Sequence, residues 1–176
     1  KNPMTTVNLE IDGEIATLTL SNPGKLNAIN LGMWLQLANH VAVLSADNGI
    51  RCIVLRGAGS EAFAAGGDLE EFVTGRATLE QALHYHDQVA AALSAIANCP
   101  HPTVALIQGA CIGGGLEIAG VCDLRICNES ARFGAPINKL GFSIYPGEMD
   151  GLLKLAGAAV MKEILLEGRI LTATEA

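Results

Sequence analysis

The chain has 176 residues, of which half are hydrophobic and 16% are charged. That length and apolar content suffice for one well-filled core, and they favour a single domain over residues 4–176. The net charge of −7, without a cluster of lysine or arginine, argues against nucleic acid or an anionic membrane as the partner. No apolar run is long enough to cross a bilayer and no export signal opens the sequence, so we expect a cytoplasmic protein.

The five cysteines are an odd number and show no C-x-x-C spacing. They stand mostly in apolar, strand-like runs, which favours buried, reduced thiols over a disulfide framework or a zinc site. His84 and His86 lie two apart on a predicted helix and face different directions, so they cannot bind one metal ion as a pair. We therefore expect no metal site.

The first predicted elements are two strands. Residues 7–11 and 15–20 alternate apolar and polar side chains around an Asp-Gly pair, which is typical of a β-hairpin. A Ser-Asn-Pro-Gly segment then ends the second strand. Apolar residues recur at helical spacing over residues 31–46, which predicts an amphipathic helix.

Three short apolar runs follow, and each suits a strand that is covered on both faces: residues 52–55, 104–107 and, more weakly, 124–127. Residues 79–96 have the apolar spacing of a long helix, which is expected to stop before Pro100. Residues 152–166 predict a last helix, and residues 168–176 predict no closing element. This alternation of strands and helices indicates an α/β fold.

Two glycine-rich turns, at residues 64–69 and 109–117, each follow an apolar strand and precede a helical pattern. Such a turn leaves the first N–H groups of the helix unpaired, with the positive end of the helix dipole behind them. If one N–H group from each turn meets the same carbonyl oxygen, the pair forms an oxyanion hole. The alternative is that the glycines serve only tight turns and packing, and for either turn alone both interpretations fit equally well.

Other glycine motifs fit less well. The third glycine of a dinucleotide fingerprint would fall on Ile118, and no P-loop is present. Glu117 lies on the first turn of a predicted apolar helix, where burial would raise its pKa toward a value useful in general acid–base catalysis. The simpler alternative is a glutamate favoured by the helix dipole, but the neighbouring glycines favour the catalytic role.

Three ordered motifs resemble those of the crotonase superfamily, the enoyl-CoA hydratase/isomerase family. Residues 20–28 resemble its N-terminal signature, residues 63–69 its first oxyanion loop and residues 109–123 its second. The resemblance covers nearly the whole chain and implies an α/β spiral of ββα turns. Family members continue past a segment like residues 170–176 into a C-terminal helical part, so we expect that part to be missing from this chain.

The resemblance also implies an acyl-CoA thioester substrate, which brings its own coenzyme A, so no separate cofactor is needed. The thioester oxygen is expected to meet the N–H groups of Gly67 and Gly114, and Glu117 matches one of the two glutamates with which hydratases act on water. The positions expected to bind substrate are Lys25, Leu26, Ala28, Ala64, Ala65, Gly66, Asp68, Leu69, Pro136, Ile137 and Tyr145. Because family members commonly form trimers, we expect a homotrimer or a dimer of trimers.

One departure from the family pattern bears on the reaction. The second hydratase glutamate follows a Phe-Gly-x-Pro pattern, and Ile137 stands at that position. Glu148 or Asp150 could take its place, although both suit the cap of the next helix better. The segment ending at Tyr145 resembles methylmalonyl-CoA decarboxylase, which also lacks that glutamate. We therefore expect an enoyl-CoA hydratase or isomerase; the alternatives are a malonyl-type acyl-CoA decarboxylase and a catalytically weak binding or assembly subunit.

Overall fold

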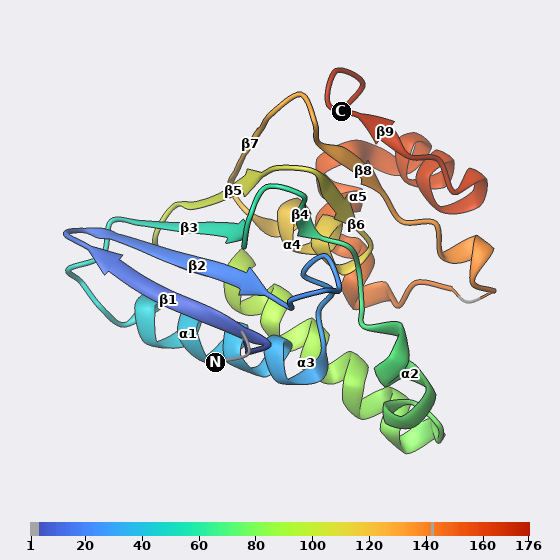
Figure 1. Cartoon of the computed structure of the whole chain (residues 1–176), viewed down its shortest axis with the longest axis horizontal. Helices are drawn as coiled ribbons and strands as arrows, with labels where there is room; N and C mark the ends of the chain where they lie inside the picture. Colours follow the sequence, from blue (N-terminus) through green and yellow to red (C-terminus); the bar gives the residue numbers. More distant parts are fainter. Residues whose placement is uncertain (1–3, 142) are drawn as a thin grey trace.

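The computed structural model describes residues 4–141 and 143–176 and has the predicted α/β class, with two sheets (Figure 1). The larger sheet contains, in spatial order, β1 (Thr6–Asp12), β2 (Ile15–Ser21), β3 (Cys52–Gly57), β5 (Thr103–Ile107) and β7 (Leu124–Cys127). The smaller sheet contains β4 (Ala62–Ala64), β6 (Ala110–Ile112), β8 (Arg132–Gly134) and β9 (Leu171–Thr172).

The helices are α1 (Leu31–Ser45), α2 (Leu69–Gly75), α3 (Leu79–Ala97), α4 (Gly114–Val121) and α5 (Pro146–Lys162), with a 3₁₀ turn at Ile137–Lys139 and a π-helical turn at Glu163–Glu167. Helices α1 and α3 pack against each other beneath the larger sheet, and α5 lies beside α4 at the other end of the molecule (Figure 1). Among residues 4–141 and 143–176, no helix is long and apolar enough to span a membrane.

The larger sheet forms as its sequence pattern predicts. Strands β1 and β2 make the antiparallel hairpin, and Gly13 at its turn has a φ of 58°, a left-handed conformation that suits glycine. Strands β2, β3, β5 and β7 run parallel. Successive side chains of a strand point to opposite faces, so Leu18 and Leu20 of β2 are both fully buried and join one core with Trp34 of α1.

The smaller sheet positions the candidate site. Strands β4, β6 and β8 are parallel, so their carboxyl ends meet at one edge. The pair β3–β4 leads to α2, the pair β5–β6 leads to α4, and the pair β7–β8 leads to the 3₁₀ turn. This repeated unit is the spiral of ββα turns that the resemblance implied. Ligands of such sheets bind outside the carboxyl ends of the parallel strands.

Two differences from the sequence prediction lie in the last third of the chain. Strand β9 pairs antiparallel with β8, so the prediction that residues 168–176 contain no closing element was wrong. A strand of two residues is too short to show a periodic pattern. Helix α5 begins at Pro146, before the predicted start at Leu152, because proline is well suited to the first turn of a helix.

The five cysteines are free thiols. Cys111 and Cys122 are buried, and burial raises the pKa of the Cys122 thiol to about 12 and also raises the pKa of Cys111. Both thiols therefore stay protonated at neutral pH. Cys127 is exposed, which the apolar pattern around it did not predict.

Candidate active site

A cavity of about 390 Å³ opens at the carboxyl edge of the smaller sheet, where the two predicted glycine turns converge. Its wall includes the three residues predicted to be catalytic, Gly67, Gly114 and Glu117. Five of the predicted substrate-binding residues also line it: Ala65, Gly66, Leu69, Pro136 and Ile137. The segments that follow β4, β6 and β8 are far apart in sequence, and the fold brings all three to one cavity.

Each expected oxyanion donor follows a glycine with a left-handed backbone. Gly66 has a φ of 105° and precedes Gly67, and Gly113 has a φ of 51° and precedes Gly114. Residues with side chains rarely adopt these angles, so glycine permits the sharp turn at each strand end. None of the hydrogen bonds within residues 4–141 and 143–176 is donated by the N–H group of Gly67 or Gly114. Both amides are therefore available to a ligand.

Close packing also requires glycine at the two donor positions. A Cβ atom on Gly67 would lie 2.6 Å from Cζ of Phe72, and one on Gly114 would lie 2.9 Å from Cζ2 of Trp34. Contacts under 3.0 Å force one of the two groups to move. An aromatic ring therefore packs against the backbone at each donor, and the packing role holds whatever the amides bind.

Glu117 lies in the first turn of α4, whose N-cap, Gly113, provides no side-chain cap. The Glu117 side chain is buried with 8% of its surface exposed, and this burial raises its pKa well above the usual value. The negative charge of Glu148 adds to this increase, and Arg76 opposes it. A carboxyl group in these surroundings favours its protonated form and can act as an acid.

A second carboxyl group reaches the cavity from α5. Glu148 lines the wall, and Nδ1 of His86 on α3 donates a hydrogen bond of 2.6 Å to its Oε1 atom. The His86 ring stacks on Tyr145 with centroids 3.4 Å apart. Sequence reasoning treated His86 as an ordinary helix residue and preferred Glu148 as a helix cap, because nothing local links residues 62 positions apart.

Six of the predicted substrate-binding residues lie outside the cavity wall: Lys25, Leu26, Ala28, Ala64, Asp68 and Tyr145. The Lys25 amino group forms ion pairs with Asp68 at 2.8 Å and Glu70 at 2.6 Å. The Ala65 N–H group donates to the Leu26 carbonyl oxygen at 3.0 Å. These contacts hold the N-terminal signature segment against the first glycine turn.

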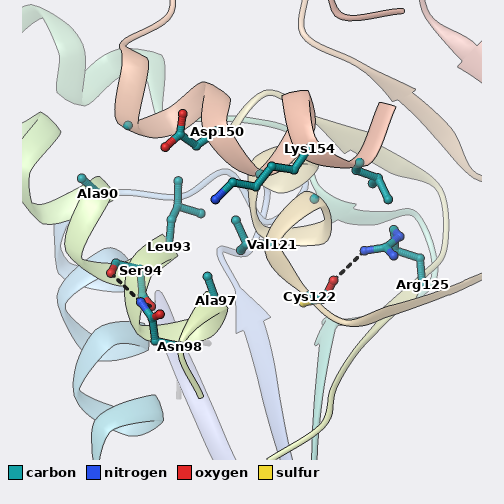
Figure 2. A pocket seen from close by; sticks show the side chains of 14 residues that line it. Ala90, Leu93, Ser94, Ala97, Asn98, Val121, Cys122, Arg125, Asp150 and Lys154 are labelled. Carbon is teal, nitrogen blue, oxygen red and sulfur yellow. Dashed lines mark hydrogen bonds between the residues drawn. The ribbon is translucent and has the colours of Figure 1, made fainter. Parts of the chain in front are cut away.

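A larger hollow of about 600 Å³ lies between α3, α4 and α5, away from the glycine turns (Figure 2). Figure 2 shows Asp150 and Lys154 of α5 on one side, with Leu93 of α3 and Val121 of α4 facing them. None of the predicted catalytic or substrate-binding residues lines this hollow. The larger hollow is therefore not the one in which the predicted site residues come together.

The family model for enoyl-CoA hydratase/isomerase matches residues 10–176. The chain therefore belongs to the enoyl-CoA hydratase/isomerase family, the crotonase superfamily, as its three motifs indicated. The crystal structure of an enoyl-CoA hydratase/carnithine racemase from Magnetospirillum magneticum superimposes with a TM-score of 0.95 at 46% sequence identity. That match covers 99% of this chain and 65% of the other.

The names of the curated relatives state different reactions, hydration and isomerisation. A probable mitochondrial enoyl-CoA hydratase of Arabidopsis thaliana is 38% identical over 169 residues, which are 94% of this chain and 54% of that protein. A mitochondrial Delta(3,5)-Delta(2,4)-dienoyl-CoA isomerase of Dictyostelium discoideum is 30% identical over 171 residues, or 92% of this chain and 58% of that protein. The chain thus spans little more than half the length of these relatives.

Proposed function

We propose that the chain is the catalytic core of an enoyl-CoA hydratase or isomerase, which stabilises a thioester enolate and moves a proton through Glu117. The observation behind this proposal is that one cavity is lined by Gly67 and Gly114, whose N–H groups donate to no acceptor within the described residues, and by a buried carboxyl group. Two N–H donors held at the place where negative charge develops are an effective way to stabilise an enolate. Coenzyme A enters as part of the substrate, and this step calls for no metal or redox cofactor.

Glu148 is proposed as the second carboxyl group of the reaction. Ile137 leaves no acid at the position where hydratases have one, but Glu148 lines the same cavity and raises the pKa of Glu117. The surroundings of the two groups differ, because Glu117 is buried among apolar neighbours whereas Glu148 accepts a hydrogen bond from His86. Two carboxyl groups in different surroundings can take different catalytic roles, one as general acid and the other as general base.

In the isomerisation of a 3-enoyl-CoA, the base removes a proton from the carbon beside the thioester. The electron pair moves onto the thioester oxygen between the two glycine amides, which gives a dienolate. Return of a proton to the carbon at the far end of the dienolate then moves the double bond into conjugation. In hydration, water adds to the β-carbon and the same oxygen takes up the negative charge before the α-carbon is protonated. Both reactions use the same two amides.

The decisive experiment replaces Glu117 with glutamine and measures the turnover of 2-enoyl-, 3-enoyl- and methylmalonyl-CoA. Loss of a general acid–base group should lower kcat/KM about 10²- to 10⁴-fold, with coenzyme A affinity retained. Asp150→Asn is the matched control, since Asp150 is an exposed acid of α5 outside the cavity and should leave the rate unchanged. Wild-type protein that turns over none of these substrates would exclude the proposal and favour a binding or assembly subunit.

The raised pKa of Glu117 also predicts how Glu117→Gln changes stability with pH. Between the ordinary value of 4.5 and its raised pKa in the fold, the folded chain holds a proton that the unfolded chain releases. Stability of the wild type therefore falls as pH rises through this window, and the glutamine variant lacks that loss. The melting temperature of the variant should therefore rise relative to that of the wild type as pH increases above 4.5 through the raised pKa. A difference that does not change with pH would contradict the buried acid.

Decarboxylation of a malonyl-type CoA is the second candidate, because an apolar side chain, Ile137, occupies the cavity wall where hydratases have an acid. Loss of CO₂ leaves its electron pair on the α-carbon and thioester oxygen, so the enolate forms without a base. This candidate predicts that methylmalonyl-CoA turnover survives in Glu117→Gln while crotonyl-CoA hydration is absent from both proteins. Glycine replacements at the two donors would impair either reaction.

We further propose that the protein is cytoplasmic and assembles as a homotrimer or a dimer of trimers. The support for this assembly is the family to which the chain belongs. Sedimentation analysis of the purified protein tests it directly, and a monomer at working concentration would contradict it.

A further inference from the structure

A cation, Arg76, lies in the cavity wall and forms no ion pair within the described residues. The Arg76 guanidinium carbon stands 3.8 Å from the ring centroid of Phe72 and 3.6 Å from that of Tyr85, and all three residues line the cavity. None of the ion pairs within residues 4–141 and 143–176 involves Arg76. The two rings fix the position of the guanidinium group without neutralising its charge.

Two buried polar atoms, one in Arg76 and one in the neighbouring Tyr85, have no hydrogen-bond partner within the described residues. Within the described part of the chain, the buried side-chain atoms without a hydrogen bond are Nε of Arg76 and Oη of Tyr85. Tyr85 is 1% exposed, so its hydroxyl group cannot turn to bulk water. Buried polar groups are nearly always satisfied in native proteins. Arg76 and Trp34 act on the Tyr85 hydroxyl group as hydrogen-bond donors, which opposes the rise in its pKa caused by burial. They offer it no acceptor, so the Tyr85 hydroxyl proton and the Nε–H group of Arg76 both still call for one, which a ligand in the cavity can supply.

The acids near Arg76 are already engaged or neutral. Glu71 accepts a hydrogen bond of 2.8 Å from the Leu31 N–H group, and Glu148 accepts one from His86. Burial favours the protonated form of Glu117. Arg76 acts on Glu117 only through its charge and forms no ion pair with these acids within the described residues, so its N–H groups remain available to a ligand in the cavity.

We propose that Arg76 and Tyr85 bind a carboxylate on the acyl group, so that the preferred substrate is a dicarboxylic acyl-CoA and not a plain fatty acyl-CoA. This inference rests on the proposed function, because it names the substrate class of the same cavity. A guanidinium group presents N–H donors in the planar geometry that a carboxylate accepts, and the Tyr85 hydroxyl can donate a further hydrogen bond. Because the rings already hold Arg76, little freedom is lost when the carboxylate binds.

The test compares the affinities of saturated acyl-CoA pairs that differ in the terminal group but not in carbon number. Malonyl-, succinyl- and glutaryl-CoA bear a carboxylate, and propionyl-, butyryl- and valeryl-CoA do not. Calorimetry on wild-type protein should show tighter binding of the carboxylate member by about 10- to 100-fold at the length that reaches Arg76, the range for a hydrogen bond to a charged group. Equal or weaker binding at all three lengths overturns the proposal.

Variants then assign the preference to these two residues. Arg76→Met keeps an apolar contact with the rings but removes the charge, and it should abolish the preference while leaving affinity for the apolar pair member unchanged. Tyr85→Phe removes one oxygen atom and should reduce the preference about 2- to 10-fold. If Arg76→Met does not fold, the wild-type series and Tyr85→Phe decide the question.

Lys139→Met is the matched control, since Lys139 is an exposed cation of the same wall that is not stacked between rings. A loss of preference in Lys139→Met as large as that in Arg76→Met would show that net charge selects the ligand, and would overturn the specific roles. Succinyl- and glutaryl-CoA and the three apolar acyl-CoAs are substrates of neither candidate reaction, so their binding is measured without turnover. Malonyl-CoA counts only where it is recovered unchanged, because the decarboxylation proposed as the second candidate would consume it. A preference for carboxylates without any catalysis would therefore sink the proposed function alone, and catalysis without the preference would sink this inference alone.

Discussion

The two glycine turns contribute matching amides to the cavity, but they are held in place differently. The first turn leads into α2, which has no buried residue. Its N-cap, Asp68, accepts a hydrogen bond from the Glu70 N–H group and pairs with Lys25. Polar contacts near the surface therefore fix the first turn.

The second turn leads into α4, where all residues from Gly115 to Gly120 are buried. Gly113 caps this helix without a side chain, and a Cβ atom on Gly115 would lie 2.5 Å from the Ala64 carbonyl oxygen. Core packing therefore fixes the second turn. The difference indicates that one donor can be adjusted from the surface, whereas the other cannot move without disturbing the core.

Among changes to the two turns, the largest combined effect on stability and activity should come from Gly114→Ala. The new methyl group would meet Trp34, a buried ring with 2% of its surface exposed and little room to move. Overpacking of this kind costs about 1–3 kcal/mol of unfolding free energy. Displacement of the amide should also lower kcat/KM about 10²- to 10³-fold. Denaturant unfolding and steady-state kinetics measure the two losses.

Gly147→Ala serves as its control, because the added methyl group would lie 3.5 Å from Cβ of Ala90, an ordinary contact on an exposed part of α5. Alanine is also the better helix former, so this variant should be as stable as wild type or slightly more so. Full stability of Gly114→Ala would show that the second turn is not fixed by the core.

Gly67→Ala should separate activity from stability. The new methyl group would meet Phe72, but this ring is only half-buried and belongs to a helix without buried residues, so it can shift. We expect an activity loss similar to that of Gly114→Ala, about 10²- to 10³-fold, with a stability loss below about 1 kcal/mol. Equal stability losses in the two variants would erase the distinction between the turns.

The sequence could predict the elements that have a local signal, but not the short strands of the smaller sheet. The larger sheet, the long helices and both glycine turns follow from hydrophobic periodicity and from glycine itself, which act locally. The three-residue strands of the smaller sheet are too short to be periodic. The elements that set the cavity edge were therefore implied only by the resemblance to a family.

The polar pairs of the cavity could not be predicted, because each joins residues that are distant in sequence or belong to different helices. Glu148 meets His86 only through the packing of α5 against α3, and Arg76 meets Tyr85 only through that of α2 against α3. The family pattern directed attention to Ile137 as the missing acid. The acid that reaches the cavity instead is Glu148, which the sequence analysis named as a possible replacement but preferred as a helix cap.

The smallest effect should come from Lys25→Met, which removes the ion pair that holds the first turn. The pKa of Lys25 is raised, chiefly by its hydrogen bonds to Asp68 and Glu70. Burial of Asp68 works to raise its pKa, but the hydrogen bonds from Lys25 and the Glu70 N–H group outweigh burial and lower it overall. Lys25 itself is partly exposed and Glu70 is exposed, and ion pairs open to solvent contribute little to stability. The melting temperature should therefore fall only slightly, and KM should rise more than kcat falls.

The pH dependence of this small loss identifies its source. Because the pKa of Asp68 in the fold lies below its ordinary value of 3.8, the stabilisation is present above that value and disappears as pH falls through the lowered pKa. The melting difference between wild type and Lys25→Met should therefore be present at pH 7 and shrink under strong acid or in high salt. Lys154→Met, at an exposed lysine of α5 for which no ion pair exists within the described residues, should show neither dependence. If the melting difference between wild type and Lys25→Met persists in acid, the charge of Lys25 is not its source. The apolar stem of the Lys25 side chain, packed against the turn, would then hold the first donor in place.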